Sequence, residues 1–74
     1  MTEPRGTAAE YLAEVARLRG IRDGFKRDQQ ALRDSGSPTD RKTADKYDHY
    51  IKVYDEAADT HQAFADIAAE REAA

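Results

Sequence analysis

The placement of its helix-breaking residues constrains this chain more than any other feature. In the interior, only the stretch DSGSPTD at 34–40 brings a proline and a glycine together. Long proline-free segments lie on both sides of it, and the first of them contains the glycines Gly20 and Gly24. Because proline cannot continue a helix and the sequence Gly-Ser-Pro favours a turn, this pattern predicts two long helices joined by one short turn.

The start of the first helix has a clear sequence signature. Thr7 followed by Glu10 forms a capping box, in which the threonine hydroxyl accepts a hydrogen bond from the amide three residues later and the glutamate reaches back. The breaker stretch ends this helix, and Gly36 suits the left-handed conformation that commonly follows a helix C-terminus. We therefore expect a helix from about residue 8 to about residue 34.

The second helix begins directly after this turn. Ser37 is the predicted N-cap and Pro38 occupies the first turn, where proline is well tolerated; Thr39 is an alternative cap. We expect this helix to run from about residue 38 to about residue 72. The predicted fold class is thus all-α, a two-helix antiparallel hairpin. It forms a single domain over 1–74, with a flexible N-terminus at 1–6 and a turn at 35–37.

The stretch KYDHYIKVY at 46–54 contains three of the four tyrosines and suggests a β-strand by residue propensity. Strict alternation, however, would leave neither face of such a strand clearly apolar. The helical spacing fits better, because Tyr47, Tyr50, Ile51 and Tyr54 fall at i, i+3, i+4 and i+7. We therefore interpret the stretch as part of the second helix, with its β-forming side chains used for packing.

Both predicted helices carry an apolar stripe along one face. In the first helix, the polar residues Arg22 and Gln29 interrupt the 3-4 spacing of this stripe. Folding the hairpin within the breaker stretch brings together positions whose numbers sum to about 72. Phe25 then lies opposite Tyr47, and Arg22 lies opposite Tyr50, where we expect a cation–π contact.

Further apolar residues lie beside this seam on the second helix, and they make its apolar face too wide for one partner helix. They are Tyr50, Val53, Ala57, Phe64 and Ile67. We therefore expect a homodimer, in which two hairpins form a four-helix bundle or a coiled coil; an isolated monomeric hairpin is the alternative. The residues expected at the protein interface are Phe25, Tyr47, Tyr50, Tyr54 and Phe64, flanked by Arg22 and Lys26.

Charge is distributed unevenly along the chain, although the net charge is only -3. Residues 17–52 contain ten basic and six acidic side chains, a net charge of +4. The remaining residues, 1–16 and 53–74, contain two basic and nine acidic side chains, a net charge of -7. In a hairpin, the turn end is therefore basic and the end with the termini is acidic.

This charge separation has three possible uses. It could fix an antiparallel arrangement of two copies by electrostatic complementarity. The basic turn end could instead bind nucleic-acid phosphates, although a pI of about 5.3 lacks the basic excess of most nucleic-acid modules. Charges that only solvate long helices are the third possibility. The residues expected at a phosphate contact are Arg33, Arg41, Lys42 and Lys46.

No motif in the chain specifies a catalytic chemistry. The histidines, His49 and His61, lack the Glu-x-x-His spacing of di-metal helical bundles. The carboxylates of the second helix have no predicted pocket that would shift their pKa values. The sequence also lacks a nucleophile–base pair, a phosphate-binding glycine loop and a zinc signature. We therefore expect no enzyme activity, no cofactor and no metal site.

The chain has no cysteine, and no apolar run approaches the roughly 20 residues that a membrane span requires. Its N-terminal segment lacks the apolar core of a signal peptide. These features predict a cytoplasmic protein with no membrane contact. The expected function is protein–protein interaction, as an adaptor, an assembly factor or an inhibitor of a larger, unidentified protein. The alternative is a nucleic-acid-associated accessory protein that uses the basic turn end.

Overall fold

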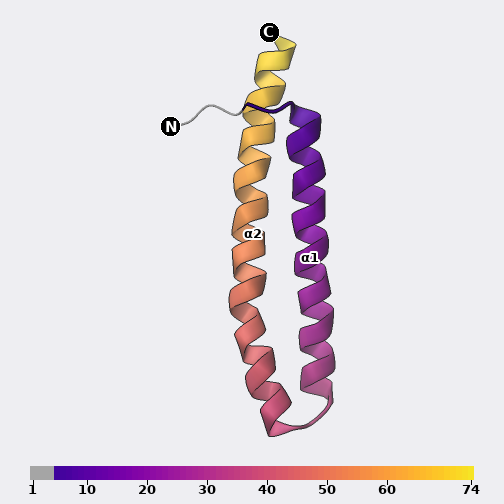
Figure 1. Cartoon of the computed structure of the whole chain (residues 1–74). Helices are drawn as coiled ribbons and strands as arrows, with labels where there is room; N and C mark the ends of the chain where they lie inside the picture. Colours follow the sequence, from indigo (N-terminus) through magenta and orange to yellow (C-terminus); the bar gives the residue numbers. More distant parts are fainter. Residues whose placement is uncertain (1–4) are drawn as a thin grey trace.

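The chain folds into two antiparallel α-helices joined by a tight turn (Figure 1). The computed structural model describes residues 5–74. Helix α1 spans Ala8–Asp34 and helix α2 spans Pro38–Ala73, so the predicted boundaries of both helices are confirmed to within one residue. Residues 5–74 contain no strand, and the tyrosine-rich stretch 46–54 is helical, as its spacing predicted.

Capping side chains define the start of each helix. Thr7 Oγ1 accepts a hydrogen bond from the Glu10 amide at 3.1 Å, and the Thr7 hydroxyl lies 3.1 Å from Oε1 of Glu10. The capping box therefore closes between the two side chains. Ser37 Oγ accepts from the Asp40 amide at 3.4 Å, which confirms Ser37 rather than Thr39 as the cap of α2.

The turn depends on one residue in an uncommon backbone conformation. Gly36 has a φ of 75°, in the left-handed region that glycine adopts without a steric penalty. Ser35, the C-cap of α1, donates its amide to the Ala31 carbonyl at 3.2 Å. The Ser35 hydroxyl lies 2.6 Å from Oδ2 of Asp40 in α2. The last turn of α1 and the first turn of α2 are thereby joined directly.

The two helices meet along a narrow seam of small side chains. Val15 and Leu18 of α1 pack against Ala58 of α2, with Tyr54 and Ala57 beside them. Alanine lets helices approach closely but contributes little apolar area, so the seam alone stabilises the hairpin only modestly. No large side chain of residues 5–74 is fully buried. The other buried hydrophobic residues are Ala44, Ala65 and Ala68.

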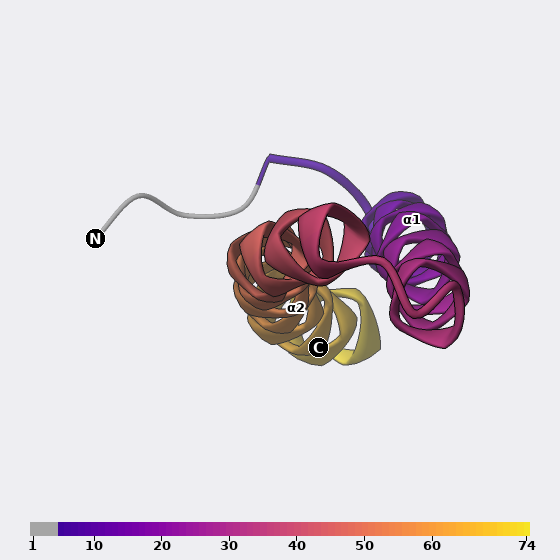
Figure 2. The same cartoon turned by 90° about the horizontal axis from the view of Figure 1, so that it is seen from below.

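The molecule is a rod one layer thick. Its extents are 55 × 21 × 12 Å, and its radius of gyration is 16.4 Å, whereas a compact domain of this length has about 11 Å. Seen end-on in Figure 2, the two helices of the described chain lie side by side, and no third element covers either one. The start of α1 and the end of α2 lie at the end opposite the turn (Figure 1). Each helix therefore has a single neighbour.

The residues just before α1 contact its first turn. The amides of Arg5 and Gly6 both donate to the hydroxyl of Tyr11, at 3.0 and 3.2 Å. The flexible N-terminus predicted for 1–6 falls largely on 1–4, which lie outside the described residues.

Candidate protein interface

An aromatic cluster spans the two helices in the turn half of the hairpin. The ring of Phe25 in α1 lies among three tyrosine rings of α2, with centroids 5.6 Å from Tyr47, 5.5 Å from Tyr50 and 5.6 Å from Tyr54. Tyr47 and Tyr50 also contact each other edge to face, at 6.0 Å. Aromatic rings attract one another at such distances and angles. The structure thus brings together four of the predicted interface residues.

This aromatic cluster is open to solvent on one side. Tyr50 and Val53, about one helical turn apart on α2, are each 45% exposed. Phe25, Tyr47 and Tyr54 are half-buried. Burial of apolar surface contributes about 25 cal/mol per Å², so covering the exposed side chains would stabilise a complex. The open side is therefore an apolar surface suited to contact with another protein.

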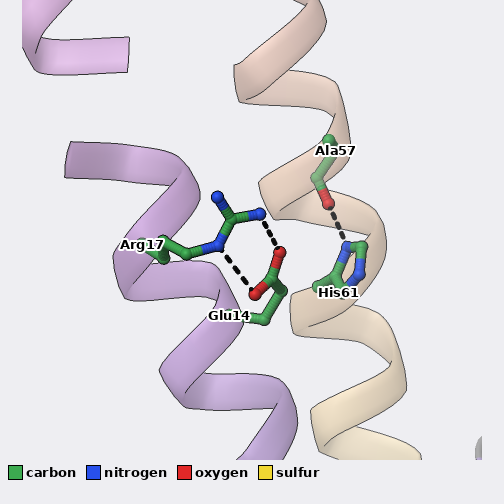
Figure 3. Close-up of polar contacts among 4 residues, drawn as sticks. All are labelled: Glu14, Arg17, Ala57 and His61. Carbon is green, nitrogen blue, oxygen red and sulfur yellow. Dashed lines mark hydrogen bonds and ion pairs between the residues drawn. The ribbon is translucent and has the colours of Figure 1, made fainter. Parts of the chain in front are cut away.

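A second aromatic group lies nearer the terminal end. Tyr11 of α1 contacts Phe64 and His61 of α2, with ring centroids 5.6 and 6.3 Å apart. His61 Nδ1 lies 2.8 Å from the carbonyl oxygen of Ala57 (Figure 3). Because a carbonyl oxygen only accepts, this contact requires the proton on Nδ1. Phe64 therefore belongs to a different ring cluster from Phe25, further along α2.

Between Tyr11 and Phe25, α1 presents a solvated ion pair. Arg17 donates to Glu14 through its Nε, at 3.0 Å, and through a guanidinium Nη (Figure 3). This bidentate hydrogen bond lowers the pKa of Glu14 and raises the pKa of Arg17. Because water screens both charges, the pair orients them on the surface and contributes little to stability.

Arg22 makes an ionic contact between the helices. Its Nη1 lies 2.6 Å from Oδ1 of Asp55, and its Nη2 lies 2.9 Å from Oδ1 of Asp23. Hydrogen bonds to Asp55 and then Asp23 raise the pKa of Arg22. We expected Arg22 to contact the ring of Tyr50, but it pairs with carboxylates instead. Tyr50 stacks on Phe25. Since Asp55 and Tyr50 are separated by about 140° around α2, the ionic and aromatic contacts lie on opposite sides of the seam.

Gln29, the second polar interruption of the seam, is buried, with 7% of its surface exposed. Its Nε2 donates to the Ala44 carbonyl at 2.9 Å and to Oδ1 of Asp48 at 2.7 Å. No buried side-chain polar atom in the described part of the chain lacks a partner. Sequence reasoning missed this contact. The available signal was a long polar side chain at a seam position, with a carboxylate near the same level of the other helix.

The basic residues predicted at the protein interface and at the phosphate contact differ in their surroundings. Arg33 lies 3.8 Å from a carboxylate oxygen of Asp45 and 3.8 Å from one of Asp48, so its charge is partly balanced. Of the predicted basic residues, those that form no ion pair within residues 5–74 are Lys26, Arg41, Lys42 and Lys46.

Two structural observations and a comparison with known proteins bear on the kind of site. Among residues 5–74, no group of three or more histidine, aspartate or glutamate side chains is positioned to hold a metal ion. In the same part of the chain, neither helix combines the length and the hydropathy needed to cross a membrane. The chain matches no protein-family model, no curated protein and no solved structure.

Proposed function

We propose that this protein is a small non-enzymatic protein–protein interaction module that acts as a self-associating helical hairpin. The observation that carries the proposal is the aromatic cluster around Phe25, which is open to solvent at Tyr50 and Val53. Aromatic side chains are enriched at protein interfaces because each ring buries a large apolar area. As an adaptor, an assembly factor or an inhibitor, the hairpin would present this surface to a larger protein.

The small core of the hairpin supports self-association. Among residues 5–74, six hydrophobic residues are buried, and four of them are alanines. A core of this size is marginal for an isolated domain. Packing two hairpins face to face would cover Tyr50 and Val53 and convert the single layer into a four-helix bundle.

Sedimentation equilibrium at micromolar concentrations tests the self-association. We expect about twice the 8.3 kDa mass of the chain. We also expect a melting temperature that rises with protein concentration, because dissociation accompanies unfolding of a dimer. A monomer whose melting temperature does not depend on concentration would contradict the proposal.

Binding to a larger protein is tested with two baits in nuclease-treated lysate. The wild-type chain should retain a protein that the Tyr50→Asp chain does not, because burying an unpaired carboxylate in an apolar interface is unfavourable. Equal retention by the two baits would show that the aromatic cluster is not the binding surface. A protein that the wild-type chain retains only from lysate without nuclease treatment would favour the second candidate function.

A nucleic-acid-associated accessory role is this second candidate, favoured by three cations at the turn end that form no ion pair within residues 5–74. Arg41, Lys42 and Lys46 are exposed there. Binding through their charges should shift a short DNA duplex in a gel, and the shift should weaken steeply with salt. Lys42→Glu combined with Lys46→Glu should abolish it. Absence of any shift at low salt would exclude this role.

A further inference from the structure

Helix α2 carries a second heptad stripe beside the seam that contacts α1. Its positions have the alternating 3-4 spacing of a coiled-coil face. They are Tyr50, Val53, Ala57, Thr60, Phe64 and Ile67. The hydroxyl of Thr60 donates to the Glu56 carbonyl at 3.0 Å, so its hydrogen-bonding need is met within the helix. The seam against α1 centres on other positions, among them the buried Ala44, Ala58 and Ala65. Along one edge of the stripe, Tyr50, Ala57 and Phe64 also contact α1. Helix α2 therefore has a second apolar face that α1 covers only in part.

This partly open face is long enough to contact a second rod. The rod is 55 Å long, and a contact strip along a helix is about 10 Å wide. Two hairpins that overlap along most of their length would cover at most about 550 Å² each, or about 1,100 Å² together. This area is just below the roughly 1,200 Å² at which standard specific interfaces begin, and it is typical of a weak, reversible dimer. A second rod of equal length covers the stripe completely, so its dimensions match a copy of the same chain.

We infer that a second copy of this chain occupies the stripe, packed antiparallel to the first along α2. The inference rests on the proposed self-association, and it adds the orientation of the two copies and the face through which they meet.

The separation of charge along the rod selects the antiparallel orientation. Residues 17–52, at the turn end, have a net charge of +4. At the other end, the described residues 5–16 and 53–74 contain two basic and eight acidic side chains, a net charge of -6. A parallel pair would bring like charges together at both ends, whereas an antiparallel pair places opposite charges side by side.

The stripe also defines a register. In an antiparallel pair of helices, core positions lie opposite each other when their residue numbers have a constant sum. A sum of about 117 matches every apolar position with another. Tyr50 then meets Ile67 of the second copy, and Val53 meets its Phe64. The small residues Ala57 and Thr60 meet nearest the two-fold axis, where the helices can approach most closely.

Spin labels on single cysteines measure the orientation, because the chain has no cysteine of its own. Thr39→Cys marks the turn end and Ala69→Cys marks the other end, both at exposed positions. With a rise of 1.5 Å per residue, the register gives backbone separations of about 60 Å for Thr39→Cys and about 30 Å for Ala69→Cys. Two separations below about 25 Å would identify a parallel dimer. That result would overturn the inference and leave the self-association intact, whereas a monomer would overturn both.

A matched pair of charge substitutions tests the contact face. Val53 and Leu12 are similarly exposed, at 45% and 47%, but only Val53 belongs to the stripe. Val53→Glu should weaken the dimer about tenfold or more, and Leu12→Glu should change its dissociation constant by less than about twofold. Both variants should keep their helical circular dichroism, since neither side chain is buried in the hairpin. A dimer that resists Val53→Glu uses another face and overturns the inference.

Discussion

Within α1, the glycines Gly20 and Gly24 face open space. A Cβ atom added to Gly20 would meet no other group within 4 Å, and at Gly24 it would meet only the guanidinium of Arg27, at 4.0 Å. Glycine in a helix interior is less favourable than alanine by about 1 kcal/mol, because the unfolded chain loses more backbone freedom. The hairpin therefore gives these two residues no structural requirement for glycine.

We expect Gly20→Ala and Gly24→Ala each to raise the free energy of unfolding by about 0.5–1 kcal/mol, as measured by urea denaturation. Gly36→Ala is the control. Since the φ of Gly36 is 75°, in the left-handed region, alanine there should lower the free energy of unfolding by about 1 kcal/mol. Loss of stability from the two helical substitutions would mean that these glycines contact another chain.

The buried Gln29 permits a second comparison of variants. Gln29→Leu should change the free energy of unfolding by less than about 1 kcal/mol, because leucine has a similar size and water can replace the lost donor at the exposed Asp48. The buried Ala44 carbonyl also loses a donor, but as a residue inside α2 it keeps its intrahelical hydrogen bond. Gln29→Ala should cost about 2 kcal/mol or more, since it leaves a cavity in the seam. Urea denaturation of both variants shows whether Gln29 stabilises the hairpin mainly by packing or mainly by hydrogen bonding. A larger loss of unfolding free energy in Gln29→Leu than in Gln29→Ala would contradict this expectation.

At the scale of the helix, the boundaries could be predicted because they depend on local chemistry. Thr7 and Ser37 each satisfy an amide three residues away, and Gly36 determines the turn through its own backbone conformation. These signals are contained in short stretches of sequence, so no knowledge of tertiary structure was needed to find them.

The contacts between helices were only partly predictable. The register obtained by folding the chain at its turn put Phe25 opposite Tyr47, and these rings are in contact. It did not predict that Arg22 pairs with Asp55, because a heptad identifies which positions face the other helix and a long side chain can reach beyond its own level. The Gln29 contact was missed for the same reason.

Ser37 and Thr39, at the start of α2, give a matched test of capping. Ser37→Ala should lower the free energy of unfolding by about 1 kcal/mol, because the Asp40 amide loses its side-chain acceptor. Thr39→Ala is the control, since the Thr39 hydroxyl forms no hydrogen bond within residues 5–74 and its carbonyl, which accepts from the Thr43 hydroxyl, is kept. Thermal melts of both chains measure the difference. Equal losses would show that the Ser37 hydroxyl contributes nothing beyond water.

For the molecule as a whole, the shape and the charge distribution both favour assembly with a second copy. Its accessible surface is 5238 Å², whereas a compact monomer of 8.3 kDa exposes about 4,600 Å². The stripe on α2 begins at Tyr50, in the region of net positive charge, and ends at Ile67, in the region of net negative charge. Apolar burial would then supply the affinity of an assembly, and the charges would supply its orientation.

One pair of residues tests whether charge sets that orientation. In the antiparallel register, Lys46 of one copy lies opposite Arg71 of the other and one position from its Glu70, since facing positions sum to about 117. Glu70→Lys alone should weaken the dimer by about 1 kcal/mol at low salt, because Lys46 then meets two cations instead of one cation and one carboxylate. Lys46→Glu alone should have a smaller effect, because the new carboxylate is repelled by Glu70 and attracted by Arg71. The double variant should recover at least the wild-type affinity, because the new carboxylate then meets two cations. At 1 M salt, where screening acts within about 3 Å, all four chains should associate equally. In a parallel dimer, each residue would instead face its own copy, so both single substitutions would leave the affinity unchanged. Sedimentation equilibrium of the four chains at both salt concentrations separates these two arrangements.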